Sequence, residues 1–144
     1  MAAVAADAAR YAEAGMTARE ALRGGLLTGL RSALPPLGVT VFDALPVRAS
    51  VPQAVLGEPS DSDWGAAGIE GRELRVTVTL TDGGEQPRRL RTAMQAVEAI
   101  ALPEGLSDGW RVAGLTVTAT RMAKSGARWT ASVEWRARLW RVGQ

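Results

Sequence analysis

Residues 129–140 read WTASVEWRARLW, and apolar residues take every second position until the closing Trp140. Alternation with a period of two is typical of a β-strand that buries one face and exposes the other. Residues 72–80, RELRVTVTL, and residues 115–121, LTVTATR, alternate in the same way. These three segments predict antiparallel strands of a sheet with one buried face.

The alternation also assigns each strand residue to a face. Threonines and charged residues, with Arg136 and Arg138 among them, are expected on the outer face, where Trp140 is the one aromatic ring. Ser125 and Gly126 can form a hairpin turn between the last two strands. The residues expected to face the core are Leu74, Val76, Val78, Leu80, Leu115, Val117, Ala119, Trp129, Ala131, Val133, Trp135, Ala137 and Leu139.

Two helices are predicted from apolar residues that recur at helical spacing. The first begins at Thr17, which together with Glu20 has the spacing of a capping box, and it ends before the prolines at positions 35 and 36. The second follows Pro87 and carries an apolar stripe that runs to Ala101. Three glycines of the first helix predict close packing against another backbone, and these are Gly24, Gly25 and Gly29.

The remaining segments complete the predicted organisation. Residues 39–42 and 53–56 are expected to be short strands, and residues 57–71, rich in Gly, Pro, Ser and Asp, a long loop. The order of elements predicts an α+β fold, an antiparallel sheet of four to five strands with two main helices packed on one face. Residues 17–144 are expected to form one domain, preceded by an alanine-rich N-terminal extension at residues 1–16.

The composition argues against several classes of function. The chain of 144 residues contains no Cys and no His, so thiol chemistry, sulfur metal sites and the most common general base are excluded. The formal net charge is only +2, whereas nucleic-acid binders usually have a larger basic excess. No apolar run reaches roughly 18 residues, and residues 1–15 lack the pattern of a signal peptide. We therefore expect a protein made and kept in a cytoplasm, with no membrane contact.

The sequence carries no recognisable catalytic, cofactor or metal motif. It has no phosphate-binding loop and no nucleophile elbow, and a Ser-His-Asp triad requires histidine. Four carboxylates in the 57–71 segment could do acid-base work, bind a hard cation or contact a partner, but a solvated acidic loop is the favoured interpretation. They are Glu58, Asp61, Asp63 and Glu70. We expect no enzyme activity, no cofactor and no metal.

Basic and aromatic residues supply further candidates for contacts. The arginines of the C-terminal strand could touch phosphates, form a soluble strand face or pair with acidic groups of a neighbouring molecule. Trp64 stands in a polar segment without core periodicity, so it could be an interface anchor or a lid folded over the core. The interface candidates are Trp64, Glu58, Asp61, Asp63, Glu70, Arg136, Arg138 and Trp140.

Four segments occur in a particular order: VFDALP at 41–46, PQAVLGE at 52–58, GRELRVTVTL at 71–80 before a Gly-Gly turn and a helix, and RWTASVEWRA at 128–137. This order, over about residues 20–142, resembles the tail-terminator and minor tail-completion family of long-tailed phages and gene transfer agents. The individual motifs are loose and hydrophobic, so their order and spacing carry the resemblance.

The resemblance implies a structural protein of a phage-like particle. Members of that family form a hexameric ring that caps the finished tail tube, stops its polymerisation and meets the head-side connector. The implied partners are copies of the same chain, the tail-tube protein and the connector, with DNA passing through the channel without sequence-specific binding. A closed ring needs a heterologous interface, and we expect the basic outer face to meet the acidic segment of the next copy. The main alternative is a small nucleic-acid-binding module that uses the Arg-rich C-terminal strand; an enzyme that uses the loop carboxylates ranks below it.

Overall fold

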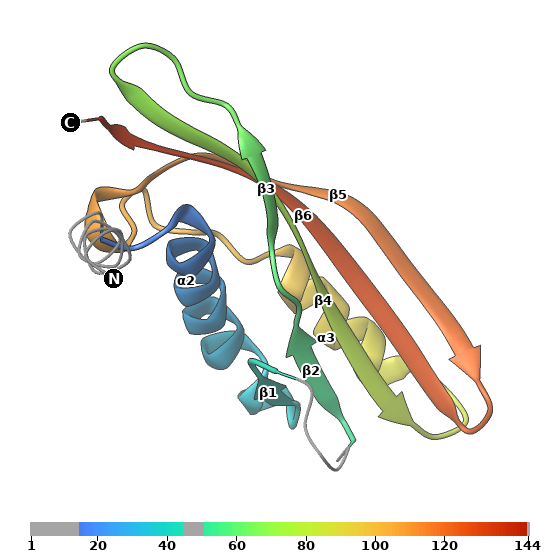
Figure 1. Ribbon diagram of the computed structural model, residues 1–144. Helices are drawn as coiled ribbons and strands as arrows, with labels where there is room; N and C mark the ends of the chain where they lie inside the picture. The colour runs from blue at the N-terminus through green and yellow to red at the C-terminus, as the bar shows by residue number, and fades with distance from the viewer. Residues whose placement is uncertain (1–14, 45–50, 144) are drawn as a thin grey trace, which may run out of the picture.

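The computed structural model describes residues 15–44 and 51–143, and two helices lie on the same side of a long, twisted sheet (Figure 1). Most of the predicted extension at residues 1–16 therefore lies outside the described residues. In chain order the elements are α2 (Ala18–Ala33), the 3-10 helix η1 (Pro35–Leu37), β1 (Thr40–Phe42), β2 (Gln53–Leu56), β3 (Ser60–Asp63), β4 (Ile69–Gly83), α3 (Arg88–Glu98), the 3-10 helix η2 (Ser107–Gly109), β5 (Arg111–Ser125) and β6 (Arg128–Val142).

The described strands form one six-stranded sheet in the order β1-β2-β4-β6-β5, and β3 pairs with β4 beyond the end of β2. All pairs are antiparallel except the short parallel pair of β1 and β2. β4 and β6 pair along their whole length, from Ile69 opposite Val142 to Gly83 opposite Arg128. The α+β prediction with both helices on one face is confirmed.

The core lies between the helices and the inner face of the sheet. Leu74, Val76, Val78 and Leu80 of β4 are buried, and each is opposite a buried residue of β6. The helices cover this face with residues such as Leu30 of α2 and Leu90 of α3, which belong to the same cluster. Burial of each such aliphatic side chain contributes roughly 1.5–3 kcal/mol, so this face fixes the register of the sheet.

α2 begins and ends as its sequence predicts. The Thr17 hydroxyl accepts a hydrogen bond from the Glu20 backbone N–H at 3.2 Å, and the helix ends before the prolines of η1. The prediction for its glycines needs correction, since side chains approach Gly25 and Gly29 and nothing approaches Gly24. A Cβ on Gly25 would lie 2.9 Å from Leu106 Cδ2, whereas a Cβ on Gly24 would meet nothing within 4 Å.

Two element boundaries differ from the predictions. The predicted loop at 57–71 contains β3 and the start of β4, because β4 extends far enough to offer a hydrogen-bonding partner to Ser60–Asp63. The apolar stripe of the second helix is shorter than predicted, because α3 ends at Glu98 and leaves Ala101 exposed in the following segment.

A bulge in β5 changes the predicted assignment of faces. The register with β6 shifts between Val117 and Ala119, so Thr118 is the extra residue. Beyond the shift, Ala119 is opposite Glu134 on the outer face and Thr120 is opposite buried Val133. The predicted core position of Ala119 is therefore wrong, whereas Leu115 and Val117 do pack against the core.

Candidate interaction surface on the outer face of the sheet

Charged residues of β4 and β6 alternate in sign across the outer face. Glu73 of β4 lies between two arginines of β6, with its Oε1 atom 3.6 Å from Arg136 Nε and 3.5 Å from Arg138 Nη2. Further along, Arg75 Nη1 lies 3.4 Å from Glu134 Oε1. These three arginines and two glutamates sum to +1, so this part of the face is a mixed-charge surface and not a basic strip.

The bulge residue joins this charged row. Thr118 donates a hydrogen bond from its hydroxyl to Glu134 Oε1 at 2.8 Å. The same hydroxyl also lies 3.3 Å from the Glu134 carbonyl oxygen. β5, the edge strand, is thereby tied to β6 where their register shifts.

Trp64 lies on this outer face and not over the core. Its backbone N–H donates to the Gly71 carbonyl at 2.9 Å, which continues the pairing of β3 with β4. A Cβ on Gly71 would lie 2.9 Å from the Trp64 backbone, so the close approach of these two backbone segments needs a glycine at position 71. The indole is 40% exposed, and the Arg138 guanidinium lies 5.4 Å from its ring centroid. Trp64 and Arg138 therefore belong to one surface.

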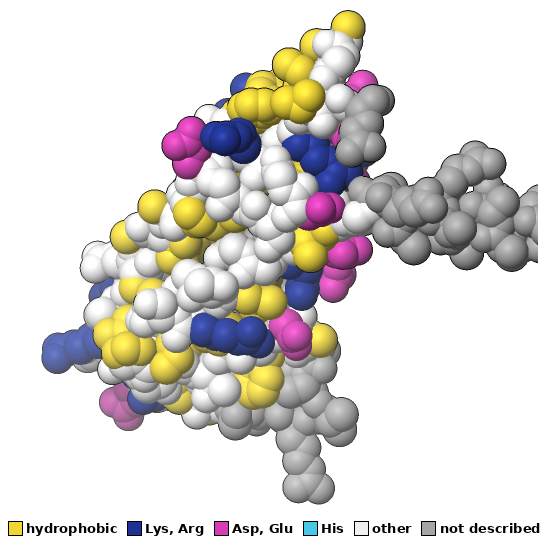
Figure 2. All heavy atoms as spheres, turned by 90° about the vertical axis from the view of Figure 1, so that its left-hand side faces the viewer, with side chains coloured by type: hydrophobic (Ala, Val, Ile, Leu, Met, Phe, Trp, Pro, Cys, Tyr) yellow, Lys and Arg dark blue, Asp and Glu magenta, His cyan; other side chains and the backbone are white. Residues whose placement is uncertain are grey.

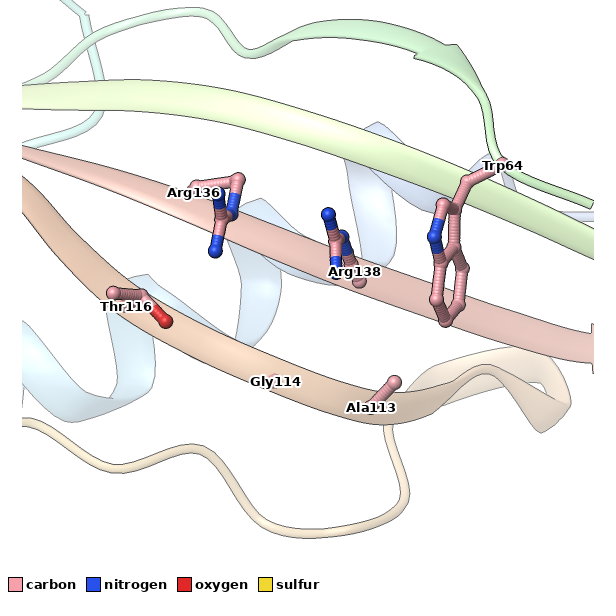
Figure 3. Close-up of a pocket in the computed structure, with 6 residues that line it drawn as sticks. All are labelled: Trp64, Ala113, Gly114, Thr116, Arg136 and Arg138. Atoms are coloured by element: carbon pink, nitrogen blue, oxygen red, sulfur yellow. The ribbon is translucent and has the colours of Figure 1, made fainter.

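A small hollow of about 170 Å³ lies between this row and β5 (Figure 3). Trp64, Arg138 and Arg136 lie along one side of it, and the small residues of β5 lie along the other. Arg138 Nε is buried and has no hydrogen-bond partner among the described residues. The hollow is lined by Trp64, Ala113, Gly114, Thr116, Arg136 and Arg138.

The four acidic candidates do not form one acidic surface. Asp61 accepts a hydrogen bond from Arg72 Nε at 2.9 Å, and Glu70 Oε2 lies 3.3 Å from Arg141 Nε. Asp63 accepts from the Gly65 backbone N–H at 3.0 Å. Glu58 is highly exposed, with 85% of its side chain accessible. Within residues 15–44 and 51–143, no three acidic side chains are grouped as a metal site would require.

Trp140 lies further along β6 on the same outer face. It is opposite Arg111 of β5, whose guanidinium lies 5.9 Å from the indole centroid. Trp140 is half-buried, unlike Trp64. The structure therefore brings together Trp64, Arg136, Arg138 and Trp140 of the predicted candidates, but separates them from the acidic ones.

A cluster that sequence reasoning missed lies on the inner side of the sheet. The Arg141 guanidinium stacks 4.3 Å from the Trp110 ring centroid and pairs with Asp108 at 3.1 Å. Asp108 in turn accepts from the Met16 backbone N–H at 2.6 Å, and Trp110 Nε1 donates to the Met16 carbonyl at 2.9 Å. These contacts hold the chain just before α2. Their sequence signal, Asp-Gly-Trp at 108–110, indicates a turn but not its partners.

A closer ion pair, between Arg89 and Asp82, lies at the other end of the sheet. Arg89 Nε and Nη2 each donate to one oxygen of buried Asp82 at 2.8 Å, a bidentate arrangement. The hydrogen bonds from Arg89 hold the pKa of Asp82 below its usual value, although burial acts in the opposite direction. This pair fastens the end of β4 to the first turn of α3.

Comparison with known proteins identifies the family to which the chain belongs. Residues 20–140 match the model of the family described as Tail completion protein gp17. The chain belongs to this family. The search of curated proteins found no match.

A solved structure similar to this tail completion protein is a chain from a virion of a native gene transfer agent particle. The two have a TM-score of 0.69 and 22% sequence identity, and the match covers 83% of this chain and 94% of the other. At that identity the likeness shows a shared fold.

Family membership makes the chain a structural tail protein. The helices of the described residues include none long and apolar enough to cross a membrane. The outer face, with its exposed tryptophan and paired charges, is the candidate contact surface of this tail completion protein (Figure 3).

Proposed function

We propose that this tail completion protein forms a ring, of six copies, that caps the finished tail tube. The ring ends tube polymerisation and presents a surface to the head-side connector, and DNA passes through its centre without sequence-specific contacts. The protein works without a cofactor and without catalysing a reaction, first in the cytoplasm of the producing cell and then in the particle tail. Membership of the tail completion family is the single observation that carries this proposal. The similar chain from a gene transfer agent virion supports it.

The outer face favours protein over DNA as its partner. A phosphate-binding surface works best when its cations are free of competing carboxylates. Here Glu73 lies between Arg136 and Arg138, and Glu134 lies beside Arg75. An exposed Trp stacked with Arg is, by contrast, a common composition of protein interface hot spots.

The experiment is a double charge reversal, Arg136→Glu with Arg138→Glu. We expect it to abolish attachment of tails to heads and to leave the low DNA affinity of the free protein unchanged. Circular dichroism and thermal melting verify that the variant is folded. Normal particle assembly combined with loss of a tight, salt-sensitive DNA affinity would contradict the proposal and favour the nucleic-acid-binding alternative.

The ring itself is tested separately from its contacts. Co-expression with the tail-tube protein is expected to give tubes that carry one ring at an end and stop growing, as seen by electron microscopy. Omission of this chain is expected to give tubes of uncontrolled length. Tubes of equal length with and without the chain would rule out a role in ending polymerisation.

A further inference from the structure

The hollow on the outer face is lined by the guanidinium groups of Arg136 and Arg138, which are hydrogen-bond donors. A guanidinium carries five N–H donors. Arg136 and Arg138 share one oxygen of Glu73 at 3.6 and 3.5 Å, longer than a charge-assisted hydrogen bond. Neither guanidinium makes a hydrogen bond within the described residues, and Arg138 Nε is buried. Arg89, by contrast, makes two hydrogen bonds of 2.8 Å to Asp82. A ligand that suits these two guanidinium groups is an acceptor with two oxygens.

A carboxylate fits the chemistry and the size of this hollow. Its two oxygens match the fork of a guanidinium, and the exposed Thr116 on the opposite side offers a hydroxyl. Trp64 supplies a flat apolar wall beside the arginines (Figure 3). The neighbouring Glu73 disfavours the higher charge of a phosphate, whereas one more carboxylate brings the two arginines and Glu73 to neutrality.

Of the three acidic candidates that form an ion pair, Glu58 has the most exposed side chain and the longest closest pair. Its Oε1 atom lies 3.6 Å from Arg23 Nε, yet 85% of its side chain is exposed. Arg23 is meanwhile occupied by backbone carbonyls: it donates to Leu56 at 2.8 Å, to Gly57 at 3.4 Å and to Asp43. Because Arg23 has these acceptors, Glu58 can leave it at little cost. Asp61 and Glu70, by contrast, have closer internal partners at 2.9 and 3.3 Å.

Glu58 and the hollow lie toward opposite edges of the sheet. Glu58 lies in the connection between β2 and β3, whereas β5, which forms one side of the hollow, is the edge strand beyond β6. A contact between two different surfaces on opposite edges is heterologous, and repetition of such a contact can close into a ring. We propose that the hollow binds the Glu58 carboxylate of a second copy, so that this pair sets the register of adjacent subunits; this inference rests on the proposed ring.

The test is a charge swap measured on assembled tails. Arg138→Glu and Glu58→Arg are each expected to reduce the number of subunits bound per tube end at least tenfold, and their combination is expected to restore most of it. Glu104→Arg is the matched control, because Glu104 is equally exposed at 84% and has a similar 3.4 Å ion pair, with Arg111. It is expected to assemble normally. Arg138→Gln and Glu58→Gln provide a second pair of variants if a reversed charge disturbs folding.

Cross-linking gives a second readout, because the chain contains no cysteine. Glu58→Cys with Ala113→Cys, treated with a short bis-maleimide, is expected to give a covalent ladder up to the full ring. Glu104→Cys with Ala113→Cys is expected to give monomers with an internal link, or no ladder.

The outcomes separate this inference from the proposed function. If rings form on tubes but the Glu58 variants assemble as well as Glu104→Arg, the inference is wrong and the ring stands. If both single reversals lose assembly without rescue by the swap, and the ladder is absent, another carboxylate occupies the hollow and the assignment of Glu58 is wrong. If the unaltered chain forms no ring on the tube, both the inference and the proposed function are wrong.

Discussion

Replacement of Trp64 by alanine separates a contact role from a role in the subunit's own stability. Within the subunit the indole lies beside the Arg138 guanidinium, and an exposed cation–π contact is worth about 0.5–1 kcal/mol. The 40% that remains exposed corresponds to about 60–100 Å² if a tryptophan offers roughly 150–250 Å². Burial of that area against a partner, at about 25 cal/mol per Å², adds about 1.5–2.5 kcal/mol per interface.

The variant Trp64→Ala is therefore expected to stay folded and to lose assembly. A loss of about 2 kcal/mol corresponds to roughly a thirtyfold weaker contact. Thermal melting of the free subunit and counting of subunits on tube ends measure the two quantities independently. A loss of subunit stability with unchanged assembly would refute the assignment of Trp64 to the interface.

Two further predictions concern the subunit alone. Asp82→Asn is expected to lower the free energy of unfolding by roughly 1–3 kcal/mol at neutral pH, because the buried pair with Arg89 is lost. Since the pKa of Asp82 is lowered in the folded state, the stability that this carboxylate adds is present above its ordinary pKa of about 3.9. It is lost as the pH falls through the folded value, so denaturant titrations between pH 7 and 2.5 should show the variant and the natural chain converging at acid pH; a constant difference would contradict this origin. Gly24→Ala is expected to raise the stability of α2 by about 0.5–1 kcal/mol, because a methyl group there meets nothing within 4 Å. An unchanged or lower melting temperature would contradict the free space around Gly24.

Patterns of local sequence predicted most of the fold. The alternation in β4 and β6 identified their buried faces, because every second side chain of a strand shares one environment. The strand β3 escaped prediction because Ser-Asp-Ser-Asp has poor β-propensity and pairs only because β4 extends to meet it. The bulge at Thr118 likewise depends on the partner strand, so the residues after it were assigned to the wrong faces.

The candidate surface was only partly predictable from the sequence. Trp64 could be selected as a residue without a core period, and Arg136 and Arg138 as outward residues of an alternating strand. The three do lie together. Their ion partner Glu73 could not be identified, because it comes from a strand more than sixty positions earlier in the chain. The ion pairs of Asp61 with Arg72 and of Glu70 with Arg141 could not be identified either, because they too join different segments of the chain.

Because of the position of β6, the sheet and the hollow on its outer face are complete only when the whole chain has been synthesised. β6 lies between β4 and β5, yet it follows all the other described strands in the chain. Until it emerges from the ribosome, β5 has no neighbour in the sheet, and the hollow lacks Arg136 and Arg138. A nascent chain, or one truncated before β6, therefore lacks this surface. The same strand completes the core and supplies Arg136 and Arg138, so the outer-face surface exists only in subunits whose sheet is complete.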